Sequence, residues 1–235
     1  MTSDPHLAPP SLAATELFRG LPPVALKTAA ACARVRWLPK DMRIFSQGDE
    51  GVRAHTVIKG GVRIAQSGSD GAQVVIRFIG PGETFGTVAL FTDGRYPASA
   101  ITLVKTLEVS WSEAELLQLM GQHPQIAINV IRIIGKRLQE VQDRVRELAT
   151  QRAERRVAHA VLRLARQAGQ NTVNGTAIEF PLRRKDVADI AGTTLHTASR
   201  ILTGWEKAGL LTSHNQRLTI RNPAEILRIA EDAAD

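Results

Sequence analysis

The chain has 235 residues, of which 43% are hydrophobic and 23% charged, so its length suits two folded domains and its composition excludes a disordered or collagen-like chain. Its single cysteine, Cys32, excludes an internal disulfide and cannot by itself build a zinc or iron–sulfur site. The sequence has no long apolar run and no N-terminal signal pattern, so we expect a cytoplasmic protein without a membrane segment.

The net charge of +7 is concentrated late in the chain. Residues 151–221 contain 12 Lys or Arg against 5 Asp or Glu, whereas residues 1–150 contain 17 against 14. Such a basic block indicates contact with a polyanion such as nucleic acid, although a solvated charged surface would give the same excess.

The first half of the chain changes from helical to β periodicity and back. Residues 13–32 favour short helices, with Pro22 and Pro23 at the start of a new turn. From residue 35 to 111, short alternating apolar runs are separated by glycine-containing turns, which predicts a β-sandwich or barrel. The Ser-Glu-Ala-Glu run at 112–115 is typical of a capped first helical turn.

A long helix follows, and its apolar residues recur at intervals of four and three, as in a coiled-coil seam. A second apolar stripe accompanies its start only, so we expect the early part to pack on the β domain and the later part to pair with a second copy in a parallel homodimer. A core helix in a monomer remains the alternative. The seam consists of Ala127, Ile131, Ile134, Leu138, Val141, Val145 and Leu148, and the second stripe of Ile126, Val130 and Ile133.

The charged segment 151–156 interrupts the seam, and we place the hinge between domains there. Beyond it the pattern predicts a helix at 157–167, a polar loop at 169–175, a strand at 177–180 and two close helices. Gly192 permits a sharp turn between those two helices, and Thr193 or Thr194 can cap the second.

The second helix of this pair has two different faces. Ala198, Ile201, Leu202 and Trp205 form an apolar face, while His196, Ser199, Arg200 and Thr203 form a polar one. A recognition helix that enters the major groove needs this division. Two short strands at 210–220, around a turn at 214–217, predict a wing. Structural helical hairpins share this geometry, and the basic excess is what favours DNA binding.

The stretches FIGPGETFGTVALFTDG and DVADIAGTTLHTASRILTGWEKAGLL, in this order of elements, resemble the Crp/Fnr superfamily of bacterial transcription regulators over residues 15–221. The resemblance implies an α+β fold, with a cyclic-nucleotide-binding-like β-roll (a jelly roll) and N-terminal helices at 1–123, a dimerisation helix at 124–150 and a winged helix-turn-helix at 151–235. It also implies a homodimer that binds an inverted-repeat operator in double-stranded DNA, with RNA polymerase as a further partner.

The family's DNA contacts can be assigned to residues of this chain. In the E-x-x-S-R motif of the family, the arginine reads a guanine of a TTG half-site and the serine contacts an adjacent base; Arg200 and Ser199 occupy these positions. His196 replaces the glutamate of the motif. The identity of the remaining bases of the half-site is therefore not predicted. We expect phosphate contacts from Arg183, Arg184, Thr194, Thr197 and Arg217.

Two departures from the family bear on the signal. Cyclic-nucleotide-binding relatives have a glutamate for the ribose and an arginine for the phosphate, where this chain has Thr87 and the run Pro97-Ala98-Ser99. Without that cation the sequence argues against cyclic AMP as the ligand. With Cys32 alone, it also argues against the iron–sulfur cluster of oxygen-sensing relatives.

The run Tyr96-Pro97-Ala98-Ser99-Ala100 resembles the branch of the family that controls denitrification and responds to nitric oxide, which is thought to use haem. His55 and His6 are then the candidate axial ligands. We expect an apolar effector pocket near the long helix; ordinary core packing, and an ordinary core or surface role for each histidine, remain the alternatives. The pocket residues would be Phe85, Thr87, Leu90, Pro97 and Ala98.

An enzyme is the competing class. The chain has no nucleophile elbow, no phosphate-binding Gly-Lys-Ser/Thr loop and no H-E-x-x-H helix, so we predict that it is not an enzyme. A regulator that responds to another small molecule, or to none, is the further alternative. The sequence leaves the signal, the target genes and the choice between activation and repression open.

Overall fold

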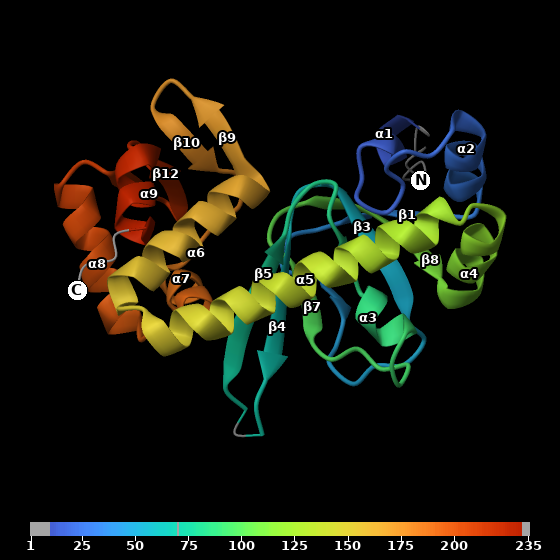
Figure 1. Ribbon diagram of the computed structural model, residues 1–235, viewed down its shortest axis with the longest axis horizontal. Helices are drawn as coiled ribbons and strands as arrows, with labels where there is room; N and C mark the ends of the chain where they lie inside the picture. The colour runs from blue at the N-terminus through green and yellow to red at the C-terminus, as the bar shows by residue number, and fades with distance from the viewer. Residues whose placement is uncertain (1–9, 70, 232–235) are drawn as a thin grey trace. The chain divides into compact units, whose positions relative to one another are not determined.

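The computed structural model describes residues 10–69 and 71–231. The described chain forms two compact units: an N-terminal unit of residues up to 73 and 79–140, and a C-terminal unit of residues 74–78 and 141 onward. The division falls inside the longest helix, α5 (Gln125–Thr150), which is the yellow-green helix in Figure 1. The end of this helix therefore belongs to the C-terminal unit.

Two four-stranded sheets are built from strands of the N-terminal unit and from β5, whose residues 74–78 are counted with the C-terminal unit. One has the order β1-β8-β3-β6 and the other the order β2-β7-β4-β5. This confirms the predicted β-roll. The bounds are β1 (Arg34–Leu38), β8 (Thr106–Ser112), β3 (Arg53–Lys59) and β6 (Thr84–Phe85) in the first sheet, and β2 (Arg43–Phe45), β7 (Ser99–Thr102), β4 (Val62–Ser67) and β5 (Gln73–Ile79) in the second.

Apolar side chains of both sheets meet in one core cluster. Val57 and Phe85 come from the first sheet, and Phe45, Val62 and Ala100 from the second. Because alternate residues of a strand point to opposite faces, strands of the first sheet also supply a second cluster on their other side. The two sheets are thus held together by burial of apolar area, which contributes about 25 cal/mol for each Å².

The second cluster lies between the first sheet and the helices α1 (Pro10–Ala13), α2 (Pro23–Ala31), α4 (Glu113–Gln122) and α5. Trp111 of β8 is fully buried, and its ring centroid lies 4.8 Å from that of Phe18. Its indole N–H donates a hydrogen bond to the Ala29 carbonyl at 2.8 Å. The predicted cap at the start of α4 is confirmed, because Ser112 and Glu115 form a reciprocal capping box.

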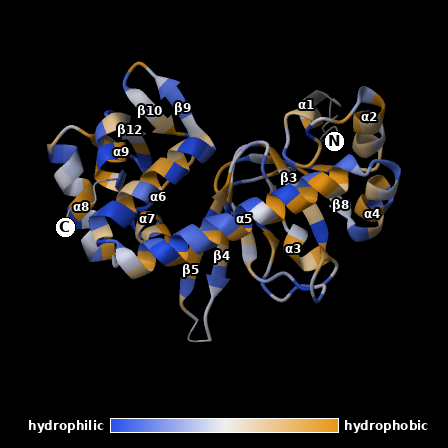
Figure 2. Cartoon of the chain, in the orientation of Figure 1, coloured by the Kyte–Doolittle hydropathy of each residue, from blue (hydrophilic) through white to orange (hydrophobic). Residues whose placement is uncertain are grey.

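Helix α5 has the two predicted apolar stripes. Ile126, Val130 and Ile133 are buried in the second cluster, which confirms that the early part packs on the β domain. Figure 2 shows the change from a mainly hydrophobic N-terminal half to a mainly hydrophilic C-terminal half. The six later seam residues are instead exposed, between 37% and 68% of each residue: Ile131, Ile134, Leu138, Val141, Val145 and Leu148.

The C-terminal unit combines helices with a small sheet of order β11-β12-β10-β9. Its core is built from apolar residues of several helices, including Val161, Leu164, Leu202 and Trp205. The elements are α6 (Ala153–Ala168), β9 (Gly169–Thr172), β10 (Gly175–Ile178), α7 (Arg184–Ala191), α8 (Leu195–Lys207), β11 (Leu211–His214), β12 (Arg217–Ile220) and α9 (Pro223–Glu231).

Two sequence predictions in this unit were wrong in detail. The segment 169–175, predicted as a polar loop, contains strand β9, and the strand predicted at 177–180 begins at Gly175 and ends at Ile178. Strand β9 is polar because it lies at the edge of the sheet and pairs only with β10, through Gly169–Ile178 and the residues up to Thr172–Gly175. The strand is formed by backbone hydrogen bonds to β10, and such bonds leave no pattern of apolar residues in the sequence.

Every helix among the described residues is too short or too polar to span a bilayer.

Candidate nucleic-acid interface

Helices α7 and α8 form the predicted helix-turn-helix. Helix α7 ends at Gly192, which has φ 61° and ψ 47°, the left-handed conformation that glycine adopts at least cost. The N-cap of α8 is Thr194, whose hydroxyl accepts a hydrogen bond from the Thr197 backbone N–H at 3.1 Å. Between the two candidate caps, the structure therefore selects Thr194.

The faces of α8 are divided as predicted. Ala198, Leu202 and Trp205 are buried, while His196 and Arg200 are exposed. Ser199 is half-buried beside Arg200. Within the described part of the chain, the Arg200 guanidinium makes no hydrogen bond or ion pair, so its five donors are available to a base edge. The predicted base-reading residues thus share one accessible side of the helix.

Arg184, the first residue of α7, is bonded to α8. Its guanidinium donates to the Ser199 carbonyl and the Thr203 hydroxyl, each at 2.7 Å, and to both carboxylate oxygens of Glu206 at 2.9 and 3.1 Å. These partners are all on α8. The structure uses Arg184 to support the recognition helix, and its geometry does not support the expected phosphate contact.

The other predicted phosphate contacts lie at exposed helix ends and on the wing. Thr194 and Thr197 are in the first turn of α8, where unpaired N–H groups and the helix dipole favour an anion. Arg183 is exposed at the N-cap of α7, and Arg217 is exposed at the start of β12. Arg217 pairs with His214 across the predicted wing turn, a tight hairpin whose two central residues both have positive φ.

A salt titration distinguishes an arginine that contacts phosphate, as expected of Arg217, from one that supports α8, as expected of Arg184. We expect Arg217→Ala to weaken operator and random DNA by the same factor and to lower the slope of log affinity against log salt by about one. Arg184→Ala should leave that slope unchanged but weaken the operator more than random DNA, because it loosens α8. Anisotropy titrations over a range of salt concentrations measure both; a slope reduced by about one in Arg184→Ala would restore it as a phosphate contact.

Most residues of the predicted apolar pocket are packed in the interior of the N-terminal unit. Phe85 belongs to the core cluster that joins the sheets, and Leu90 packs against both clusters. Thr87 and Ala98 are buried, whereas Pro97 is exposed. The space beside Phe85 is filled by Tyr96, which stacks on Phe45 with ring centroids 3.6 Å apart and planes at 6°. Core packing, the alternative reading, describes these residues.

A chain of polar groups is buried in the same interior. His55 is 3% exposed and Glu108 is fully buried. His55 Nδ1 lies 2.5 Å from Glu108 Oε1, and His55 Nε2 lies 3.1 Å from the Tyr96 hydroxyl. Arg36 donates to the other oxygen of Glu108 at 3.0 Å, and the Tyr96 hydroxyl accepts from the Arg53 backbone N–H at 2.7 Å. Each member is therefore bonded, as a buried polar network requires.

The protonation states follow from these contacts. Burial lowers the pKa of His55, and this outweighs the opposing effect of the Glu108 carboxylate. Burial alone would raise the pKa of Glu108, but the hydrogen bonds of His55 and Arg36 and the charge of Arg36 lower it below its usual value. A neutral imidazole that donates from Nδ1 and accepts at Nε2 fits both partners.

This geometry does not fit His55 as a haem ligand. Both of its ring nitrogens are hydrogen-bonded, and aromatic rings of Phe45, Phe85 and Tyr96 surround it. Iron would have to displace Tyr96 or Glu108 and open the core. The other candidate, His6, lies outside the described residues.

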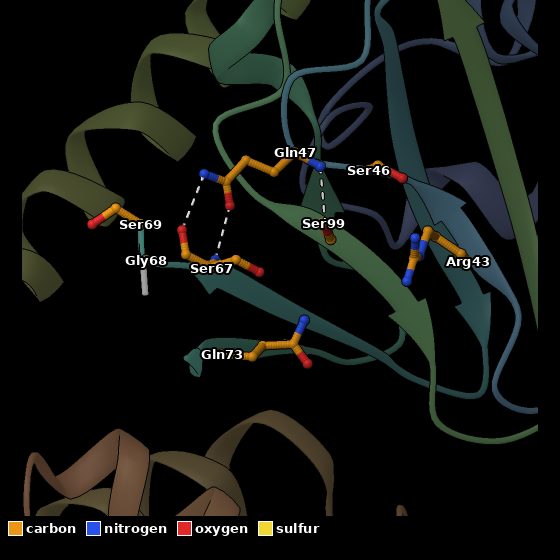
Figure 3. Close-up of a pocket in the computed structure, with 8 residues that line it drawn as sticks. All are labelled: Arg43, Ser46, Gln47, Ser67, Gly68, Ser69, Gln73 and Ser99. Atoms are coloured by element: carbon orange, nitrogen blue, oxygen red, sulfur yellow. Dashed lines mark hydrogen bonds between the residues drawn. The ribbon is translucent and has the colours of Figure 1, made fainter. Parts of the chain in front are cut away.

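A polar hollow of about 510 Å³ opens on the second sheet instead (Figure 3). Arg43, Gln73 and several serine side chains line it, among them Ser99 of the run 97–99, where cyclic-nucleotide-binding relatives have an arginine for the phosphate. Gln47 forms a two-way pair with the Ser67 backbone and donates its own N–H to the Ser99 hydroxyl at 2.9 Å. Hydroxyls and one guanidinium suit a small hydrophilic ligand, not an apolar one.

Sequence reasoning missed Glu108 and Arg36 and treated Tyr96 only as part of a family run. One signal was available: Glu108 is the one charged residue of strand β8 and lies between Leu107 and Val109. A carboxylate is rarely buried without a partner, so such a residue predicts a basic group opposite it. Which group that is depends on the strand pairing, β1 with β8 and β3 with β8.

Two regions of the chain match known protein families. Residues 35–123 match the cyclic nucleotide-binding domain, and residues 155–229 match the Crp-like helix-turn-helix domain. The first region contains the sheets of the β-roll, and the second contains the helix-turn-helix.

Whole-length relatives agree. The chain is 30% identical over 214 residues to the cyclic AMP receptor protein of Thermus thermophilus, covering 91% of this chain and 96% of the relative. It is 30% identical over 205 residues to the nitrogen fixation regulation protein FixK of Azorhizobium caulinodans, covering 87% and 79%. The solved structure of FixK2 from Bradyrhizobium japonicum matches with a TM-score of 0.74 and 26% identity, over 86% of this chain and 99% of that one. These domains and relatives are those of regulators and not of enzymes, and the chain belongs to the Crp/Fnr family of DNA-binding transcriptional regulators.

Proposed function

We propose that the protein is a homodimeric regulator that binds a TTG-type inverted repeat and controls transcription through RNA polymerase. One observation carries the proposal: α8 presents the exposed pair His196 and Arg200 on a helix whose other side is buried. The exposed seam of α5 supports the dimer, because six apolar residues at coiled-coil spacing lose contact with water when a second copy covers them. Two copies would present two such helices to two half-sites.

Base discrimination by Arg200 tests this function. The arginine fork matches O6 and N7 of guanine together, and this match contributes about 1–3 kcal/mol of discrimination. Arg200→Ala should therefore bind an operator with the half-site guanine and one with that base replaced almost equally well, while the wild type keeps its preference. Competition titrations with the two duplexes measure it. If Arg200→Ala weakens specific and random DNA by the same factor, the assignment is wrong.

For the signal, nitric oxide bound by haem remains a proposal that rests on the family run at 96–100. The contacts of His55 count against haem at that residue, which leaves His6. An absorption spectrum after haem addition, with and without nitric oxide, tests it: a Soret band that shifts with nitric oxide and is lost in His6→Ala supports the proposal, and no haem uptake removes it.

A second candidate is a regulator that needs no ligand in its β domain. The observation that favours it is the closed interior, where Tyr96 stacks on Phe45 and bonds to His55. A ligand shifts an equilibrium only by binding two states differently, and the packed rings around His55 count against a ligand there. Operator affinity that cyclic AMP, nitric oxide and haem all leave unchanged would support this candidate.

A further inference from the structure

The linker after α5 and the turn of the helix-turn-helix are joined by one side chain, Arg156 of α6. Its guanidinium donates to the Gln151 carbonyl at 2.6 Å, to the Ala191 carbonyl at 2.9 Å and to the Gly192 carbonyl at 3.1 Å. Gln151 lies in the linker between α5 and α6, whereas Ala191 and Gly192 end α7. All four residues belong to the C-terminal unit.

Two further contacts hold the same parts together. Leu148, near the end of α5, lies against Gly192 so closely that a Cβ at position 192 would collide with its side chain. Glu147, the residue before it, is buried and accepts hydrogen bonds from Arg163 of α6 at 2.7 and 2.9 Å. The segment 151–156, which we expected to be a hinge, is thus flanked on both sides by residues with fixed contacts.

From these contacts we infer that Arg156 is a positioning residue for operator recognition: it fixes the helix-turn-helix to the end of the dimerisation helix. The inference rests on the proposed function, since orientation matters only if two copies bind two half-sites. Movement of α5 would then reach the turn before α8 directly, and the linker would transmit it instead of absorbing it.

The chemistry requires an arginine. The last carbonyls of a helix lack partners within it, and a cation near them is favoured by the helix dipole. A guanidinium has donors in a planar fork that can serve three carbonyls at once, whereas the ammonium of lysine is a single point. Arg156→Lys keeps the charge but cannot make all three bonds, and Arg156→Gln removes the charge as well.

Half-site spacing gives a readout that a purely structural role would not change. Operators are selected from random-sequence DNA with the wild-type protein and resynthesised with one base pair inserted at the centre, which rotates the half-sites by about 35°. The wild type should bind the altered operator about 100-fold more weakly, whereas Arg156→Gln should lose less than about tenfold, because its recognition helices can adjust. Arg156→Lys should lie between them.

The matched control is Arg166→Gln, an exposed arginine on the same helix. It should keep the wild-type spacing ratio. Thermal unfolding of each full-length variant identifies any variant that fails to fold, and Arg156→Lys then replaces Arg156→Gln in the comparison. A folded Arg156 variant with the wild-type spacing ratio would overturn the inference. A wild-type protein that selects no operator would instead overturn the proposed function.

Discussion

Replacing Leu138 and Val145 with glutamate should give monomers that bind the operator at least about 100-fold more weakly than the wild type. Both residues are exposed on the later seam of α5, at 58% and 61%. In a dimer the substitutions would bring four like charges into an apolar seam, where charges are poorly solvated. Each monomer keeps its own recognition helix but loses the energetic linkage between two half-sites.

Sedimentation velocity and DNA titration of the same preparation test this prediction. The control is Leu117→Glu, which places the same charge at an exposed leucine on α4, 51% exposed and away from the seam. The control should remain a dimer with wild-type affinity. If the double variant also sediments as a full dimer, the seam is not the interface.

Glu108→Ala should lower the free energy of unfolding by about 3 kcal/mol or more, because removing one member of a buried charged network leaves the others unpaired. His55 would lose the acceptor for Nδ1, and Arg36 would lose its carboxylate. Urea unfolding measures the change. Glu113→Ala, at an exposed glutamate of α4, should change stability by less than about 0.5 kcal/mol. An equally small effect at Glu108 would show that the network contributes little.

The pH dependence has a defined sign. Burial lowers the pKa of His55 in the folded chain, so the unfolded chain takes up a proton first as the pH falls through about 6.5. Stability from this residue is therefore lost as the pH falls below that value. Glu108, whose folded pKa is also lowered, adds a loss as the pH falls further, through its unfolded and then its folded pKa. His55→Gln should remove the first loss, which urea midpoints at pH values on both sides of about 6.5 measure.

Local patterns predicted the elements that local chemistry determines. The alternation of four and three along α5, the capping box at Ser112 and the turn at Gly192 each depend on neighbours within one helix or turn, and each is confirmed. The two faces of α8 follow from the same reasoning. The exposed position of His196 and Arg200 was therefore predictable before the fold was known.

The contacts that sequence reasoning missed depend on partners far along the chain. Arg184 was assigned to phosphates because it is basic and precedes α7, but Glu206, 22 residues later, holds it. Glu108 meets His55 across 53 residues of sequence, and strand β9 exists only because β10 pairs with it. Apolar residues such as Phe85 predicted a pocket and a core equally well, because periodicity records burial and not empty space.

Selection of DNA by the wild-type protein tests the central claim most directly. The purified chain is incubated with duplexes of random sequence, and the bound fraction is amplified and sequenced over several rounds. We expect an enriched inverted repeat with a TTG-type element in each half and half-site centres about 34–36 Å apart, one turn of DNA. Enrichment of no sequence, or of a single half-site without its inverted copy, would contradict it.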